Sequence, residues 1–203
     1  MFIKKYITEF IGTLFLVLAV GLSGGNPLAI GATLMVMIYA GGHISGGHYN
    51  PAVTMAVFVR GRIVLNEALM YMGSQLAGAL VAALLVSIFV TIPDTALQEL
   101  NVTKALIAEL LGTFALAYVV LNVATAKSNS GNSYYGLAIG FTVFAMAVCF
   151  GGYSGGAFNP AVAVGASIMK IFAWKNIWIY ILACFGGGIL AGFVFNANNP
   201  DDK

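Results

Sequence analysis

The sequence predicts an all-α membrane protein with six transmembrane helices and two re-entrant half-helices, arranged as an inverted 3+3 repeat. Three observations carry this prediction: a composition suited to lipid, a duplication of the chain, and two copies of one short turn. Of the 203 residues, 60% are hydrophobic and 8% are charged, and the mean hydropathy is +0.93. A soluble domain has about 25% charged residues, so this chain cannot cover a surface that faces water. The formal net charge of +2 gives no indication of a nucleic-acid partner.

The duplication is visible in two pairs of matching segments. Residues 7–13 (ITEFIGT) match residues 107–113 (IAELLGT) at an offset of 100. Residues 28–31 (LAIG) match residues 137–140 (LAIG) at an offset of 109, which is also the offset between the two copies of the short turn. The sequence therefore predicts a single transmembrane domain over residues 1–203. It consists of one repeat at about 1–92, a second at about 100–197, and a polar C-terminal tail at 198–203.

The short turn occurs as GGHYNPAV at 46–53 and as GGAFNPAV at 155–162. In each copy an extended, Gly-rich approach leads to an asparagine, Asn50 or Asn159, which is followed by proline. An asparagine accepts a hydrogen bond from the unpaired amides at a helix start, and proline has no amide proton to leave unpaired. Each copy therefore predicts the start of a short apolar helix.

Apolar segments long enough to cross about 30 Å of hydrocarbon can be counted along the chain. The six spans are expected at 6–22, 28–42, 66–90, 104–125, 134–150 and 176–195. The short helices, at 50–59 and 159–169, have about ten residues and cross only half of a bilayer at ~1.5 Å per residue. A polar loop with Pro93, Asp94 and Glu99 joins the halves, and the tail is expected to be frayed.

Three spans in each half place the second copy upside down relative to the first. The two short helices then enter from opposite faces, and Asn50 and Asn159 meet near the midplane. Irregular backbone at that depth is tolerated only where it is buried in protein or lines a water-filled cavity. The sequence thus predicts a pore whose wall includes backbone carbonyls from Gly46, Gly47, His48, Tyr49, Gly155, Ala157 and Phe158.

The distribution of basic residues predicts the orientation of the chain. With the N-terminus inside, the cytoplasmic side collects six basic residues and the other side three. The first set is Lys4, Lys5, Arg60, Arg62, Lys127 and Lys203, and the second is Lys104, Lys170 and Lys175. We therefore expect both termini to be cytoplasmic.

Asn50 and Asn159 are the strongest candidates for a functional site. Each side-chain amide can donate to a passing oxygen from the positive end of a half-helix, and two such ends facing each other oppose the passage of cations, protons included. Glu9 and Glu109 are the acids well inside the spans, where a carboxylate is a candidate for a proton relay. Their symmetric placement, without a Lys or Arg inside a span, instead favours hydrogen bonds to amides of the Gly-rich loops.

The remaining polar residues indicate neither a metal site nor a catalytic one. His43 and His48 are the only histidines, and a pH gate at either is an alternative to a contribution from the His48 carbonyl. Cys149 and Cys184 lie in apolar runs without metal-ligand spacing and are expected to be buried. No nucleophile–base constellation is evident, so we expect no enzyme activity, no metal and no cofactor.

These motifs resemble the aquaporin (major intrinsic protein) family over nearly the whole chain. The matching segments are residues 43–54 (HISGGHYNPAVT), residues 156–161 (GAFNPA) and the paired Glu-x-x-Gly-Thr motifs at 9–13 and 109–113. The resemblance implies a homotetramer in the cell membrane, with one pore per subunit that conducts water or small uncharged solutes.

The resemblance also places the family's selectivity filter, by spacing from the two turns, on Ile30, Ala147, Gly156 and Val162. Water-selective members usually have an aromatic residue at the first position, histidine at the second and arginine at the last. The apolar replacements imply a wider filter that admits glycerol, urea, ammonia or hydrogen peroxide alongside water. A strict water channel, a secondary transporter and a structural membrane protein are the alternatives.

Overall fold

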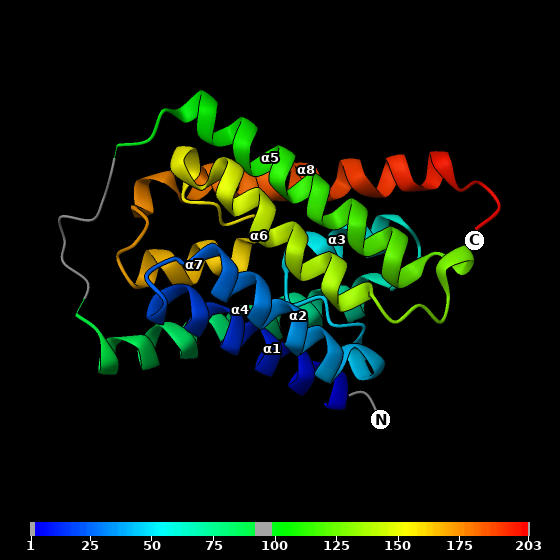
Figure 1. Cartoon of the computed structure of the whole chain (residues 1–203), viewed down its shortest axis with the longest axis horizontal. Coiled ribbons are helices and arrows are strands. Elements are labelled where there is room, and N and C mark those ends of the chain that lie inside the picture. Colours follow the sequence, from blue (N-terminus) through cyan, green and yellow to red (C-terminus); the bar gives the residue numbers. More distant parts are fainter. Residues whose placement is uncertain (1–2, 92–98, 203) are drawn as a thin grey trace.

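The computed structural model describes residues 3–91 and 99–202, which form helices and loops without a β-strand. Six long helices and two short ones follow one another along the chain (Figure 1). Their bounds are α1 Ile3–Leu22, α2 Pro27–Ser45, α3 Pro51–Val59, α4 Leu65–Phe89, α5 Val102–Val120, α6 Tyr135–Ser154, α7 Pro160–Ile168 and α8 Ile177–Asn198. A π-helical turn, Leu121–Thr125, extends α5 to the end predicted for the fourth span. Of the loop expected to join the halves, Glu99 is described, whereas Pro93 and Asp94 lie outside the described residues.

The two halves pack as equivalent sets of helices. Helix α1 packs on α4 in the first half, and α5 packs on α8 in the second, while α2 packs on α6 across the two halves. Each short helix packs on a long helix of the other half, because α3 of the first half packs on α8 and α7 of the second half packs on α4. Each half therefore completes the interior of the other, and α3 and α7 lie inside the bundle (Figure 1).

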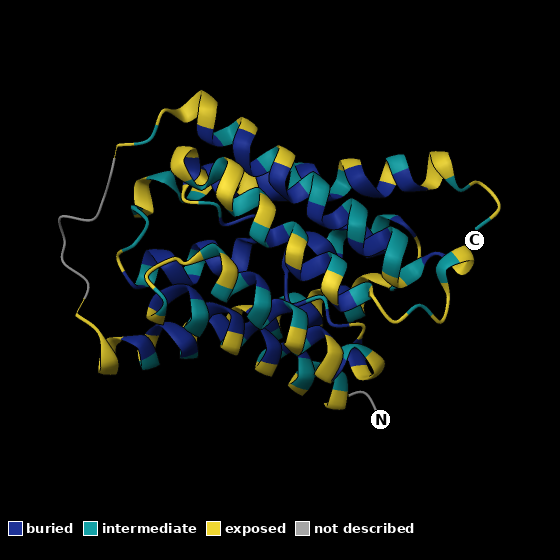
Figure 2. Ribbon diagram, viewed as in Figure 1, coloured by how far each residue is buried: buried dark blue, intermediate teal, exposed yellow. Residues whose placement is uncertain are grey.

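The outside of the bundle is apolar, as a lipid-facing surface requires. Large hydrophobic side chains are exposed along all six long helices, and buried residues face inward (Figure 2). The same six helices, counting the π-helical turn with α5 and the preceding 3-10 turn with α8, are long and apolar enough to cross a membrane. The chain is thus a multi-pass membrane protein.

Both helices that precede the short turns are longer than predicted. Helix α2 continues through Gly42 and His43 to Ser45, and α6 continues to Ser154. They end only where the next glycine adopts the left-handed conformation, with φ of 91° at Gly46 and 89° at Gly155. Glycine adopts this conformation without steric cost. The helix therefore ends at the glycine that adopts it and not at the glycines that come earlier in the sequence.

Close packing at the centre depends on a glycine of α8. A β-carbon placed on Gly188 would lie 2.3 Å from the backbone oxygen of Ala52 on α3, whereas one placed on Gly186 would lie no nearer than 3.8 Å to a neighbouring atom. We expect Gly188→Ala to destabilise the fold by about 1–3 kcal/mol, because backbone cannot shift as a side chain can. Gly186→Ala, in the same helix, is the control and should melt like the wild type in detergent. Equal melting temperatures for the two variants would contradict the packing.

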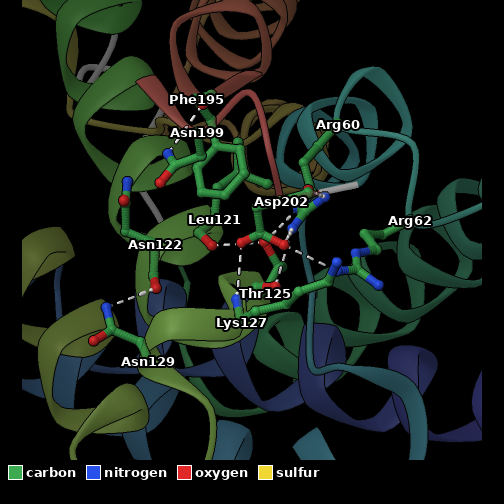
Figure 3. Close-up of polar contacts among 10 residues, drawn as sticks. All are labelled: Arg60, Arg62, Leu121, Asn122, Thr125, Lys127, Asn129, Phe195, Asn199 and Asp202. Carbon is green, nitrogen blue, oxygen red and sulfur yellow. Dashed lines mark hydrogen bonds and ion pairs between the residues drawn. The ribbon is translucent and has the colours of Figure 1, made fainter. Parts of the chain in front are cut away.

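The polar tail is held in place rather than frayed. Arg60, at the end of α3, donates from Nη1 to the carbonyl oxygen of Asp202 at 2.9 Å and from Nη2 to its carboxylate at 2.9 Å. The Asp202 carboxylate also accepts from the backbone N–H of Lys127 at 2.8 Å and from Arg62 at 3.2 Å (Figure 3). The Arg60 guanidinium, which is buried, further lies 4.6 Å from the centre of the Phe195 ring. A buried charge needs a charged partner, and Asp202 supplies one for Arg60. This requirement explains why the tail is ordered as far as Asp202.

This tail contact makes stability depend on pH. The Lys127 N–H and, after it, Arg60 hold the pKa of Asp202 below its ordinary value of 3.8. A lowered carboxyl pKa stabilises the fold above the ordinary value, and the contribution disappears as pH falls through the pKa of the folded state. We expect Asp202→Asn to lower the melting temperature in detergent at pH 7, and its difference from the wild type to shrink as pH falls below 3.8 and through the lower pKa of the folded state. Asp201→Asn, which removes the neighbouring exposed carboxylate, should match the wild type at every pH in this series.

Candidate functional site

Two asparagines from opposite halves meet at the centre of the bundle. The Asn50 Oδ1 accepts from the backbone N–H groups of Ala52 and Val53, at 2.8 and 3.4 Å, and so caps α3. The Asn159 Oδ1 caps α7 in the same way. Proline in the first helical position and an extended asparagine fix both helix starts.

The two asparagines also bind reciprocally to the opposite loop. The Asn50 Nδ2 donates to the carbonyl oxygen of Phe158 at 2.9 Å, and the Asn159 Nδ2 donates to that of Tyr49 at 2.9 Å. An amide nitrogen carries two hydrogens, so each asparagine retains one donor beyond this contact. The starts of α3 and α7, where the helix dipoles are positive, are thereby locked together.

A buried carboxylate holds each loop that leads to an asparagine. Glu9 accepts from the backbone N–H groups of His48 and Tyr49, at 3.0 and 2.7 Å, and from the Ser45 hydroxyl at 2.6 Å. In the second half, Glu109 accepts from Ala157 N–H and Phe158 N–H, at 2.9 and 2.7 Å, and from the Ser154 hydroxyl at 2.6 Å. All of these contacts are donated to the carboxylate oxygens, which is the pattern of a loop anchor rather than of a group that exchanges a proton.

The loops are not simply extended, as the sequence suggested. Tyr49 and Phe158 adopt positive φ angles of 48° and 47°, which are uncommon for residues with a side chain. The conformation turns each N–H toward a glutamate and each carbonyl toward the opposite asparagine. The rings fold onto Gly12 and Gly112, where an added β-carbon would lie 2.1 and 2.2 Å from the ring. The Glu-x-x-Gly motif therefore supplies both the acceptor and the space that this turn needs.

Several supporting residues were missed by the sequence reasoning. The Tyr71 hydroxyl donates to the Ser45 carbonyl at 2.8 Å, and the Tyr180 hydroxyl donates to the Ser154 carbonyl at 2.6 Å. Both pairs are related by the offset of 109 residues, so comparing the halves position by position would have found them.

The same offset relates Gln75 and Cys184, which complete the two glutamate sites. The Gln75 amide donates to Glu9 at 2.8 Å, and the Cys184 thiol lies 3.5 Å from Glu109. Cys184 is buried, as expected, but Cys149 is exposed on α6. A buried thiol thus takes the place of an amide in the second half.

Two cavities border the loop that leads to Asn50, and we call them the apolar cavity and the loop cavity. The apolar cavity, of about 520 Å³, reaches Asn50 and Asn159 and has mainly aliphatic walls, including Leu16, Leu34 and Val143. All four predicted filter positions, Ile30, Ala147, Gly156 and Val162, line it. The loop cavity, of about 800 Å³, lies at the opposite end beside Arg62 and residues 123–132.

The predicted wall residues are divided between the two cavities. Tyr49, Gly155 and Ala157 line the apolar cavity, and Gly46 lines the loop cavity. His48 lines both, while Gly47 and Phe158 lie outside both walls. The Phe158 carbonyl is instead the acceptor of Asn50.

Comparisons with known proteins agree with this geometry. Residues 1–195 match the model of the family described as "Major intrinsic protein". The chain is 35% identical to "Probable aquaporin NIP4-2" of Arabidopsis thaliana, over 98% of this chain and 76% of the relative. It is also 35% identical to "Glycerol uptake facilitator protein-like 6" of Lactiplantibacillus plantarum, over 98% of this chain and 100% of the relative.

A solved structure has the same fold. The aquaglyceroporin from Plasmodium falciparum superposes with a TM-score of 0.83 over 97% of this chain and 96% of the other, at 22% sequence identity. The matched family model covers nearly all of the sequence, including both asparagine turns and both glutamate motifs. The chain therefore belongs to the major intrinsic protein family.

Proposed function

We propose that the chain forms a passive channel for water and small uncharged solutes, with glycerol, urea, ammonia and hydrogen peroxide as candidate solutes. The reciprocal pairing of Asn50 and Asn159 at the cavity centre carries this proposal. It sets two positive helix ends and two spare amide donors beside the apolar cavity, an arrangement that attracts solute oxygens and opposes cations. Relatives named as aquaporins and as a glycerol uptake facilitator-like protein support both water and glycerol.

The assignment of the filter to Ile30, Ala147, Gly156 and Val162 is part of the same proposal. These side chains are small or aliphatic and border a cavity of about 520 Å³. In this proposal Glu9 and Glu109 support the loops and move no proton. The channel carries out no chemical reaction and works as a homotetramer in the lipid of the cell membrane.

The orientation proposed is one with both termini in the cytoplasm. The start of α1 and the end of α8 lie at the same end of the bundle (Figure 1). Arg60, Arg62 and Lys127 gather there around Asp202 (Figure 3). Lys5 of α1 pairs with Glu67 of α4 at 2.7 Å. Basic residues concentrated at one end favour the cytoplasmic side for that end. Lys203, counted with them, lies outside the described residues.

Stopped-flow light scattering on proteoliposomes tests the proposed function. Vesicles that contain the protein should shrink faster than empty vesicles in an osmotic gradient and then re-swell with glycerol or urea, without any ion gradient. A flux that requires an ion gradient would indicate a secondary transporter. Membrane insertion without any flux would indicate a structural protein, and water flux without solute flux would indicate a strict water channel.

Val162→Arg tests the filter assignment within this proposal. Val162 lines the apolar cavity next to the start of α7, so an arginine there adds a bulky charged donor to an aliphatic wall. We expect glycerol permeability to fall about tenfold while water permeability is kept, because a narrow polar filter favours water. Val64→Arg adds the same side chain at an exposed position outside both cavities and should change neither flux. Unchanged glycerol flux in Val162→Arg would contradict the filter assignment.

A further inference from the structure

The two cavities share one wall residue. Of the residues that the structure describes, His48 alone lines both the apolar cavity and the loop cavity. The four filter positions all border the apolar cavity, on the same side of this junction. A solute that passes from one cavity to the other therefore passes His48.

The His48 ring is fixed on two sides. Its Nδ1 lies 3.1 Å from the Thr54 hydroxyl, and the ring lies tilted at 57° against the Tyr71 ring, with 5.2 Å between the ring centres. Tyr71 is itself buried and donates to the Ser45 carbonyl. Thr54 and Tyr71 together hold the ring in one orientation.

The partners of Thr54 determine which ring nitrogen carries the proton. The Thr54 hydroxyl donates its one hydrogen to the Asn50 carbonyl at 3.0 Å and accepts from the Gln75 Nε2 at 3.0 Å. Gln75 is oriented by its second contact, from Nε2 to the Glu9 carboxylate. With its hydrogen used, Thr54 accepts from the ring, so His48 Nδ1 is the donor and Nε2 of the neutral ring is an acceptor.

The acceptor atom of the ring lies beside a glycine. A β-carbon placed on Gly46 would lie 3.2 Å from the His48 Nε2, and this nitrogen makes no hydrogen bond within the described chain. The second half has no counterpart, since the residues 109 positions after His48 and Thr54 are Ala157 and Ala163. Only the first of the two repeated turns thus carries a histidine with an acceptor nitrogen.

We propose that His48 forms a second selectivity-determining point, beyond the four filter positions, and sets the upper size limit of this channel. Its Nε2 accepts a hydrogen bond from the O–H or N–H groups of water and small polyols or amides as they leave the asparagine pair. Thr54 is a positioning residue that holds the ring through Nδ1. This inference rests on the proposed channel function and assigns its size limit to one side chain.

Flux measurements on His48→Ala separate the inference from the channel function. In proteoliposomes, His48→Ala should raise the permeability to glycerol and to the larger polyol erythritol about fivefold or more relative to water, because the ring no longer narrows the path. His43→Ala, which removes the exposed second histidine outside both cavities, should behave like the wild type. Ile30→Ala, which enlarges the filter, should change the erythritol-to-water ratio less than His48→Ala does.

The possible results have distinct meanings. A wild-type protein without passive flux would overturn the proposed function itself. Passive flux with an unchanged size limit in His48→Ala, or a larger change in Ile30→Ala, would overturn only the role of His48.

Nitrogen NMR provides a second test that does not depend on the folding of His48→Ala. In a His43→Gln background, ¹⁵N-labelled histidine reports His48 alone, because the chain has two histidines. We expect one neutral ring at pH 8 with Nδ1 protonated and Nε2 unprotonated. Thr54→Val, which keeps the shape but removes the acceptor, should abolish this preference. A ring protonated at Nε2, or one unaffected by Thr54→Val, would overturn the proposed arrangement.

Discussion

Replacing Glu109 by alanine is expected to destabilise the protein by on the order of 3 kcal/mol or more and to abolish solute flux. The substitution removes the acceptor of two backbone N–H groups, at Ala157 and Phe158, and of the Ser154 hydroxyl. Glu109 is fully buried, so water cannot replace the lost acceptor. Each buried donor left unpaired costs about 1–3 kcal/mol. Phe158 also supplies the carbonyl that accepts a hydrogen bond from Asn50. Disturbing the turn at Phe158 is therefore expected to disturb the asparagine pair as well.

Glutamine is expected to replace Glu109 poorly, which distinguishes a loop anchor from a proton carrier. One carboxylate oxygen faces Ala157 N–H and the other faces Phe158 N–H. A glutamine must point its NH₂ group at one of them, so at least one backbone donor is opposed by another donor. A lower melting temperature in detergent is expected for both variants, with Glu99→Ala, an exposed carboxylate, as the control. A Glu109→Gln protein with wild-type stability that had lost only a pH-dependent flux would instead support the proton relay.

The broad architecture could be predicted because a lipid environment limits the backbone structures that a chain can adopt. In hydrocarbon each spanning segment must satisfy its own backbone, so hydropathy and length give the six spans directly. The repeat then gives the inversion, and the two Asn-Pro turns give the half-helices. The repeat also puts Glu9, Glu109, Asn50 and Asn159 in matching motifs of the two halves, all within the residues that the family model matches.

The details that could not be predicted from the sequence depend on contacts between segments far apart in the chain. The left-handed backbone conformation of Tyr49 and Phe158 is stabilised by a glutamate, a glycine and the opposite asparagine around each residue. The conformational preferences of tyrosine and phenylalanine themselves give no indication of it. The order of the tail depends on Arg60, which lies 142 residues before Asp202. The orientation of the His48 ring follows from Thr54 and Gln75, from two further helices. Hydropathy identifies which residues lie in the membrane but not which buried polar groups pair there.

Replacing both Asn50 and Asn159 by aspartate is expected to raise cation leak by about tenfold or more. The Asp Oδ1 retains the helix cap, but no N–H remains to donate to Phe158 or Tyr49, and an oxygen faces each carbonyl instead. The negative charge also cancels the positive ends of α3 and α7, which contribute up to roughly 1–2 kcal/mol each in buried geometry. Potassium-loaded proteoliposomes, monitored by the decay of a diffusion potential, provide the measurement.

The chain supplies its own control for this experiment. Asn26 also caps a helix that begins with proline, since its Oδ1 accepts from Leu28 N–H and Ala29 N–H at 3.0 and 3.1 Å. It is exposed at the start of α2, and it lines neither cavity. Asn26→Asp therefore makes the same chemical change at a helix start without placing charge in the pore. Equal leak from the Asn26 variant and the double variant would assign the effect to disturbed caps. Leak confined to the double variant would locate the cation barrier at the asparagine pair, because there the starts of α3 and α7 meet at the wall of the apolar cavity.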